Sequence, residues 1–282
     1  MVRAELSPRG PYSLRLSGRL ASDATRIVAG GTYRATVRVG ERLERVHALQ
    51  RPDGRIVVAA ESDAGVDHVR FALGLDDDHS EFLRRFERDP LLAETLRHLR
   101  GLRPMRTGTV AQALLRAVAG QLIQAGRARQ IERAVVQAAT PALGGLHAAP
   151  TPAELGRFAP ADLARLGLGA RRAGALVRLC RGSDLEGLKR NSTRTVVARL
   201  TRERGLGPWS VGIVCLHGLG RYDYGLYRDL GLARLAGALW GRYVEPEETD
   251  ELLVPYAEWA GLASVYLLAG FRRGFVRLPL AA

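Results

Sequence analysis

The sequence is poor in cysteine and almost without lysine. Its 282 residues include two cysteines, Cys180 and Cys215, which stand far apart and form no Cys-x-x-Cys pair. Zinc sites and iron–sulfur clusters built from four cysteines are therefore excluded, and we predict no metal and no cofactor. Lys189 is the one lysine, so any chemistry that needs a lysine amine has a single candidate.

Long hydrophobic runs are missing as well. No stretch approaches the roughly 18 uninterrupted apolar residues of a membrane span, and the residues after Met1 lack the apolar run of a secretion signal. We therefore expect a cytoplasmic protein without a membrane partner. The apolar fraction is 46%, which is ordinary for a folded chain with one large domain or two modest ones.

Positive charge is concentrated in the middle of the chain. Residues 1–78 hold 12 arginines and 11 acidic residues, whereas residues 97–221 hold 21 basic and 6 acidic residues, a net charge of +15. A genome that favours arginine explains the scarcity of lysine, but it does not explain this asymmetry. The distribution indicates a face that binds a polyanion, with nucleic acid preferred over acidic proteins.

The hydrophobic pattern changes along the chain. Up to about residue 70 it alternates, at Tyr12, Leu14 and Leu16 and again along 33–39, and RPDG (51–54) is a good β-turn sequence. Beyond residue 79 helical periods dominate, over about 109–124, 128–139, 160–166, 170–181, 193–203, 208–218, 229–240, 247–260 and 263–271, with a Gly/Pro-rich break at 140–152. We predict an α+β fold, with a small antiparallel β domain at 1–76 and a larger all-α region at 77–282.

A tight turn separates two of these helices at about 200–212. Arg204, Gly205, Leu206, Gly207 and Pro208 follow one another there. The glycines allow positive φ angles and close approach of another molecule, and a proline suits the first turn of a helix. The free N–H groups at that helix start form a site for a phosphate, although a plain turn between helices explains a lone Gly-x-Gly equally well.

An aspartate follows at the start of another helix. Asp229 stands 22 residues after Gly207, at the end of a loop over about 221–230. By position alone an N-cap carboxylate is the simpler interpretation. The alternative is a functional carboxylate at the mouth of a cleft opposite the turn.

The segment RGLGPWSV (204–211) followed by DYGLYRDLGL (223–232) resembles the hairpin and aspartate of the helix-hairpin-helix DNA glycosylases. Within that superfamily the chain is most similar to the 3-methyladenine DNA glycosylase II family. AVAGQLIQAGRARQI (117–131) and LARLGLGARRAGALVRLCRG (163–182) resemble further elements, so the similarity covers about 79–275. The resemblance implies a base-excision repair enzyme that flips a damaged base out of DNA and hydrolyses its N-glycosidic bond.

The resemblance also assigns roles to residues. Asp229 becomes the catalytic carboxylate, which stabilises an oxocarbenium-like sugar and orients water. Relatives that also nick the strand use a lysine two residues beyond the second glycine, where this chain has Trp209, so we expect no lyase activity. Gln121 and Leu122 correspond to the pair that enters the DNA where the base has left. The base pocket positions are Trp209, Ile213, Leu230 and Leu262, and the flat ring of Trp209 would stack on a cationic alkylated purine.

Three of those pocket positions are aliphatic where well-known members carry aromatic residues. This departure affects the choice of damaged base and leaves the reaction type unchanged. We predict a monomer that binds double-stranded DNA containing damaged, alkylated purines. The alternatives are an enzyme for oxidised or deaminated bases, a non-catalytic protein that kept the hairpin for DNA binding, and a helical module for protein interaction.

Overall fold

The N-terminal part of the chain is a five-stranded antiparallel sheet, as predicted. The computed structural model describes residues 1–278. The strands, β1 (Val2–Leu6), β2 (Arg26–Ala29), β3 (Thr32–Val39), β4 (Arg42–Gln50) and β5 (Ile56–Ala60), lie in the order β1-β5-β4-β3-β2. The 51–54 sequence makes the expected turn between β4 and β5, closed by a hydrogen bond from the Gly54 N–H to the Arg51 carbonyl. The α+β fold class is confirmed.

Two segments of this part differ from the prediction. The alternation at Tyr12, Leu14 and Leu16 does not form a strand: α1 (Leu14–Ser17) is one helical turn, capped by the Ser13 side chain, with Leu14 fully buried. A segment of only four residues is too short to distinguish the two-residue period of a strand from the 3.6-residue period of a helix. The segment after β5 is likewise helical, as α2 (Asp63–Ala72), capped by Ser62.

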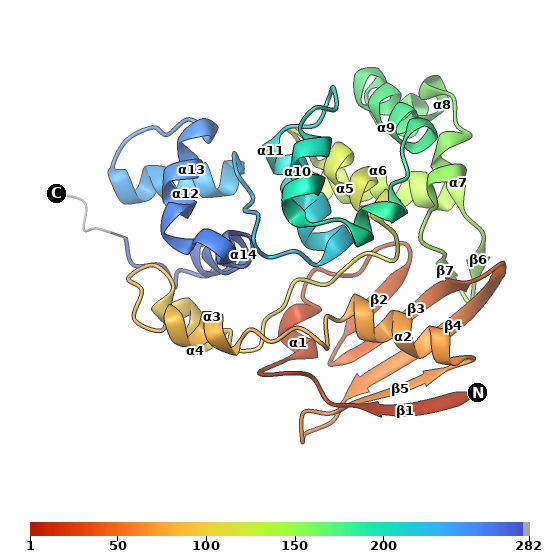
Figure 1. Ribbon diagram of the computed structural model, residues 1–282, viewed down its shortest axis with the longest axis horizontal. Coiled ribbons are helices and arrows are strands. Elements are labelled where there is room, and N and C mark those ends of the chain that lie inside the picture. Colours follow the sequence, from red (N-terminus) through yellow and green to blue (C-terminus); the bar gives the residue numbers. More distant parts are fainter. Residues whose placement is uncertain (279–282) are drawn as a thin grey trace.

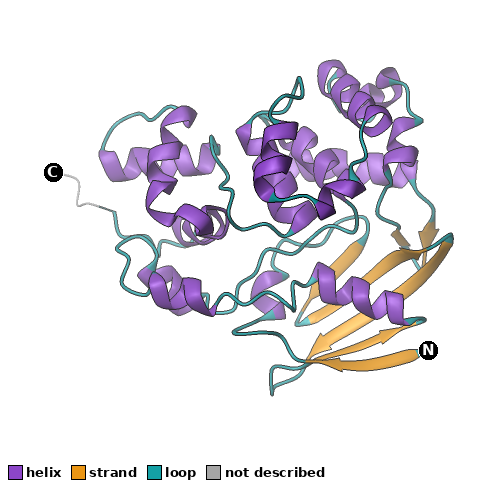
Figure 2. Cartoon of the chain, viewed as in Figure 1, coloured by secondary structure: helices purple, strands orange, loops and turns teal. Residues whose placement is uncertain are grey.

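Helix α2 covers one face of the sheet (Figure 2). Its buried side chains Val66 and Val69 pack against sheet residues that include Tyr33, Val46 and Val58. This small core is distinct from a much larger one, which extends over the helices from Phe82 to Val276. The boundary near residue 76 stays a prediction.

The rest of the described chain is almost entirely helical (Figure 1). Its elements are α3 (Ser80–Arg85), α4 (Ala93–His98), α5 (Val110–Gly120), α6 (Ala125–Ala139), α7 (Pro152–Gly156), α8 (Pro160–Arg165), α9 (Ala170–Gly182), η1 (Glu186–Arg190), α10 (Thr193–Leu200), α11 (Pro208–Ile213), the π-helical η2 (Val214–Leu219), α12 (Leu230–Trp240), η3 (Pro246–Glu248), α13 (Thr249–Leu253), η4 (Val254–Trp259) and α14 (Ala260–Phe271). The helix predicted over 109–124 is interrupted, because the chain turns between Gly120 and Ala125. The helix predicted over 247–260 is broken into three short pieces, with non-helical backbone at Ala257.

The predicted break at 140–152 contains a small hairpin. Strands β6 (Ala142–Leu143) and β7 (Leu146–His147) leave the helical region and reach the sheet (Figure 1). The Thr36 hydroxyl donates to the Leu143 carbonyl at 2.8 Å, and the His147 N–H donates to the Ala24 carbonyl at 2.9 Å. The sheet is therefore attached to the helices by more than the connecting chain.

A buried ionic network makes a second attachment. Arg116 on α5 contacts Asp23 of the loop before β2 at 2.9 Å and Glu132 of α6 at 2.8 Å. Burial raises the pKa of Asp23, but Arg26 and Arg116 outweigh it and hold this pKa below its ordinary value. Removing one member of such a network leaves an uncompensated buried charge, so the two parts are fixed relative to each other.

The C-terminal segment Pro246–Phe271 is apolar and long enough to cross a membrane by length and composition alone. Here it is a series of short helices, and α14 buries residues such as Leu262, Tyr266 and Leu267 in the large core. A core helix of this kind passes the same compositional test as a membrane span, so the segment is explained by packing.

Candidate active site and DNA interface

The α10–α11 hairpin has the tight geometry that its glycines predict, with one correction. Gly205 has φ +99°, in the region that favours glycine, whereas Gly207 has φ −95° and ψ 174°, which any residue adopts. The need for glycine at Gly207 is therefore not conformational. Space is open beyond its Cα, and Gly207 is exposed, so a side chain there would meet whatever docks on the helix start.

The hairpin is held in place by the core and by α9. Leu206 is buried in the large core, and its N–H donates to the Glu203 carbonyl. Arg178 of α9 donates from its guanidinium to the Arg204 carbonyl at 2.5 Å, while the Arg204 side chain is exposed. Pro208 begins α11, so the N-terminal N–H groups of this helix lie at the protein surface beside an exposed arginine. That arrangement suits a phosphate.

Helix α11 continues without a break into the π-helical turn η2, which ends at Gly220 with φ +65°. Wide turns of this type often occur at functional sites. The chain then crosses a loop in which Arg228 has φ +63°, held by a 2.7 Å hydrogen bond from its N–H to the Thr249 hydroxyl. This positive φ directs the chain into α12, so Asp229 comes directly after a constrained residue.

Asp229 is the N-cap of α12 and also faces the hairpin helix. Its Oδ1 accepts from the N–H groups of Gly231 at 2.7 Å and Leu232 at 3.1 Å. Its Oδ2 accepts from the indole N–H of Trp209 at 2.8 Å. The carboxylate is only partly buried. The capping interpretation is therefore correct in geometry, but it accounts for just one of the two oxygens.

Gln121 and Leu122 occupy the turn between α5 and α6 and point in different directions. The Leu122 side chain is 86% exposed, and its backbone has φ +54°, which is strained for a leucine. The Gln121 amide instead donates to the Gly205 carbonyl at 2.8 Å and to the Ser210 hydroxyl at 3.0 Å. A strained, exposed leucine beside the hairpin fits an apolar wedge, and Gln121 joins that wedge turn to the hairpin.

The predicted pocket positions are not all brought together at one surface. Trp209 is partly buried beside Asp229, and Leu230 is 46% exposed next to it. Ile213 is buried, and Leu262 of α14 is fully buried in the large core. Trp209 and Leu230 therefore adjoin the carboxylate, whereas Leu262 is enclosed in the core.

The two thiols and the loop tyrosine of this region stay protonated at neutral pH. Burial raises the pKa of the Cys215 thiol to about 12, and Cys180 is affected in the same way, so neither is a thiolate at neutral pH. Burial also raises the pKa of Tyr224 to about 12, which keeps this loop tyrosine protonated. Neither thiol and no phenolate at Tyr224 is therefore available as a nucleophile or base at neutral pH.

Lys189 lies away from the hairpin. Its amine pairs with Glu186 of η1 at 2.8 Å, and Glu186 in turn caps the start of α5 by accepting from the Val110 N–H. The hairpin contacts the opposite end of α5, through Gln121. An α5 of 11 residues spans about 16 Å at 1.5 Å per residue, so its Glu186-capped end and its Gln121 end are about that far apart.

Sequence reasoning missed two residues that shape the site. Gly120 ends α5, and a Cβ there would lie 2.6 Å from the six-membered ring of Trp209. Ser210 is buried on α11 and accepts from Gln121. The small residue preceding Gln121 was a signal for close packing, but its partner lies 89 residues away and only the fold reveals it.

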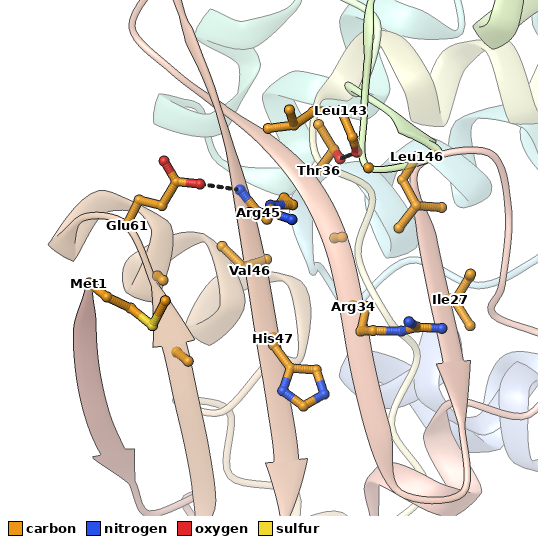
Figure 3. A pocket seen from close by; sticks show the side chains of 15 residues that line it. Met1, Ile27, Arg34, Thr36, Arg45, Val46, His47, Glu61, Leu143 and Leu146 are labelled. Atoms are coloured by element: carbon orange, nitrogen blue, oxygen red, sulfur yellow. Dashed lines mark hydrogen bonds between the residues drawn. The ribbon is translucent and has the colours of Figure 1, made fainter.

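A hollow of about 660 Å³ lies elsewhere, over the sheet face that α2 leaves open (Figure 3). Arg34, Arg45 and His47 of β3 and β4 line it together with Leu143 and Leu146 of the β6–β7 hairpin. None of the residues assigned to catalysis or DNA contact borders it. Within residues 1–278, no group of three or more His, Cys, Asp or Glu side chains is arranged to hold a metal ion.

Comparison with known proteins gives consistent matches. No protein-family model matches the chain. A DNA-3-methyladenine glycosylase of Bacillus subtilis (strain 168) is 26% identical over 255 residues, which cover 86% of this chain and 84% of the relative.

Solved structures match over nearly the full length. The 3-methyladenine DNA-glycosylase from Archaeoglobus fulgidus has a TM-score of 0.81 at 22% identity, covering 97% of this chain and 99% of that one. An 8-oxoguanine glycosylase/lyase of Clostridium acetobutylicum, in complex with double-stranded DNA containing cytosine opposite 8-oxoG, has a TM-score of 0.77 at 18% identity, covering 97% and 98%. The likeness extends over the sheet as well as the helices.

Proposed function

We propose, from the premise that this chain belongs to the helix-hairpin-helix DNA glycosylase superfamily, that it is a monofunctional DNA glycosylase of base-excision repair. It hydrolyses the N-glycosidic bond of damaged, alkylated purines after flipping the base out of double-stranded DNA. The observation that carries the proposal is the placement of Asp229, with one oxygen capping α12 and the other facing the hairpin helix at the edge of the interface.

The reaction follows from three neighbouring parts. The N–H groups at the start of α11 bind a backbone phosphate and position the DNA without reading its sequence. Leu122 fills the gap left by the extruded base and offsets part of the unstacking cost. Asp229 stabilises the positive charge that develops on the sugar and orients the attacking water. These roles need no cofactor, and the enzyme acts as a monomer on chromosomal DNA in the cytoplasm.

The absence of strand cleavage follows from the position of the lysine. A Schiff-base mechanism requires an amine that reaches the sugar C1′. Trp209 occupies the position beside Asp229, and Lys189 is engaged with Glu186 at the far end of α5. The product is therefore an intact strand with an abasic site.

One panel of oligonucleotides tests the substrate and the reaction together. Duplexes that carry a single alkylated, oxidised or deaminated base are incubated with the protein and analysed before and after alkali. We expect alkylated purines to yield strand breaks only after alkali, and borohydride to trap no protein–DNA adduct. Release of only oxidised bases would favour the alternative, a glycosylase for oxidised bases. The aliphatic side chains of Ile213 and Leu230 support that alternative, because the alkylation-repair relatives carry aromatic residues there. A trapped adduct that disappears in Lys189→Arg would contradict the monofunctional assignment.

A further inference from the structure

The two oxygens of Asp229 are held by different parts of the fold. Oδ1 is occupied by the N–H groups of Gly231 and Leu232, which belong to the same helix start. Oδ2 has a single protein donor, the indole N–H of Trp209, which comes from the hairpin helix. A carboxylate oxygen accepts at two lone-pair positions, so the Trp209 bond leaves Oδ2 one direction for a water molecule or a sugar.

The indole of Trp209 packs against the turn at Gly120–Leu122, which we call the wedge turn. Its six-membered ring packs on Gly120, so closely that a Cβ at Gly120 would lie 2.6 Å from it. The next residue, Gln121, donates to Gly205 and Ser210, which flank Trp209 along the hairpin. Trp209 therefore lies between the wedge turn at Gly120–Leu122 and the carboxylate, and it contacts both.

We infer that Trp209 is a positioning residue, whose indole N–H fixes the direction in which Asp229 presents Oδ2, while Gly120 and Gln121 fix the indole. The inference rests on the proposed function and deepens it. The resemblance alone gives Trp209 the different role of stacking on a flipped base. The two roles differ in what they require: stacking needs an aromatic ring, whereas positioning needs the N–H donor.

The physical reason is preorganisation. A carboxylate on a helix N-cap can still rotate about its χ2 angle, and a donor from a second, rigid element limits that rotation. Charge stabilisation depends on the oxygen lying where the positive charge develops, so a small misplacement costs more in rate than in binding. Because the donor is packed against the wedge turn, seating of Leu122 in DNA and alignment of Asp229 are mechanically connected.

The sharpest test replaces the N–H without changing the shape of the side chain. β-(3-benzothienyl)alanine, introduced at position 209 by nonsense suppression, substitutes sulfur for the N–H and keeps a bicyclic aromatic ring. We expect single-turnover base release to fall at least tenfold, with the melting temperature and the affinity for undamaged duplex unchanged within twofold. Trp209→Phe should behave alike, because it also retains an aromatic ring and lacks the donor. Parental rates in the benzothienyl protein would overturn the inference and return Trp209 to stacking.

Two further variants separate this inference from the proposed function. Gly120→Ala keeps the N–H but displaces the ring, so base release should again fall while duplex binding persists; a parental rate there would contradict the mechanical connection to the wedge turn. In an Asp229→Asn background the benzothienyl substitution should have no additional effect, because the group that it positions is gone. If Asp229→Asn is inactive but the benzothienyl protein releases the base at the parental rate, only the positioning role is overturned. A fully active Asp229→Asn protein would overturn the catalytic role of Asp229, whereas a parent protein that releases no damaged base at all would overturn the proposed function itself.

Discussion

Leu122 combines a strained backbone with an exposed apolar side chain. Its backbone has φ +54° and its side chain is 86% exposed, so burial of the side chain does little to offset the backbone strain. Left-handed backbone costs a non-glycine residue about 1–2 kcal/mol. A strained and exposed leucine beside the hairpin agrees with the proposed wedge role.

The variant Leu122→Gly should therefore be at least as stable as the parent and less active. We expect an unchanged or higher melting temperature and at least a tenfold loss in single-turnover base release, because the extruded state loses its apolar filler. Ala257→Gly, which relieves a second strained position that lies in η4, serves as the control and should keep full activity. Loss of stability in Leu122→Gly would show that the leucine is a packing residue.

His79 gives the protein a predictable response to acid. It is 2% exposed, neither ring nitrogen has a hydrogen-bond partner among the described residues, and it packs edge-on against Tyr222. Burial, reinforced by Arg103, lowers the pKa of His79 to about 4. The unfolded chain binds this proton near pH 6.5 and the folded chain does not, so stability is lost as the pH falls from about 6.5 toward 4.

Thermal unfolding between pH 7 and pH 4.5 measures this effect. The melting temperature of the parent should fall over that range, and the fall should be smaller in His79→Phe, which keeps an aromatic ring without a titrating group. An identical slope in parent and His79→Phe would exclude His79 as a source of the acid sensitivity.

At the scale of elements, the hairpin was predictable and its surroundings were not. Gly205 and Pro208 are local signals, since one needs positive φ and the other begins a helix. The turn after Gly120 was hidden inside an apolar helical pattern, because no proline marks it and its stabilising bonds come from residues about 85 positions away. Leu262 was placed by resemblance at a pocket, and only the packing of α14 shows it fully buried.

The hairpin makes a prediction of its own. Gly207→Glu should fold normally, because Gly207 has an ordinary φ and open space beyond its Cα. A carboxylate at this N-cap also suits the helix dipole. It would occupy the proposed phosphate site, however, so affinity for duplex DNA should fall at least tenfold in fluorescence anisotropy. Leu49→Glu, which adds the same charge on the sheet, should bind as the parent does. If Gly207→Glu and Leu49→Glu bind duplex DNA equally well, the hairpin is only a structural turn.

At the scale of the whole molecule, charge and architecture agree. Residues 1–78 carry a net charge of only +1, whereas the segment 97–221, which contains the wedge turn and the hairpin, has a net charge of +15. Counterion release makes the affinity of such a surface depend steeply on salt. If about six phosphates are contacted, affinity for undamaged duplex should fall roughly a thousandfold between 50 and 200 mM salt. A flat dependence in anisotropy titrations would contradict DNA binding by this face.

The central claim is that Asp229 acts as a catalyst as well as an N-cap, and its charge separates the two roles. Asp229→Asn keeps the size of the side chain and an oxygen that can cap α12, so as a cap alone it should cost at most about 1 kcal/mol of stability and little activity. As the catalyst, it should lose about 100-fold or more in rate, comparable to losing one preorganised electrostatic contact.

The decisive measurement is single-turnover release of a damaged base by parent, Asp229→Asn and the control Asp223→Asn, whose exposed carboxylate lies in the same loop. We predict a loss of about 100-fold or more for Asp229→Asn alone, with duplex affinity retained or slightly increased because a negative charge near the phosphates is removed. Near-parental release by Asp229→Asn would contradict the account and leave Asp229 as a helix cap.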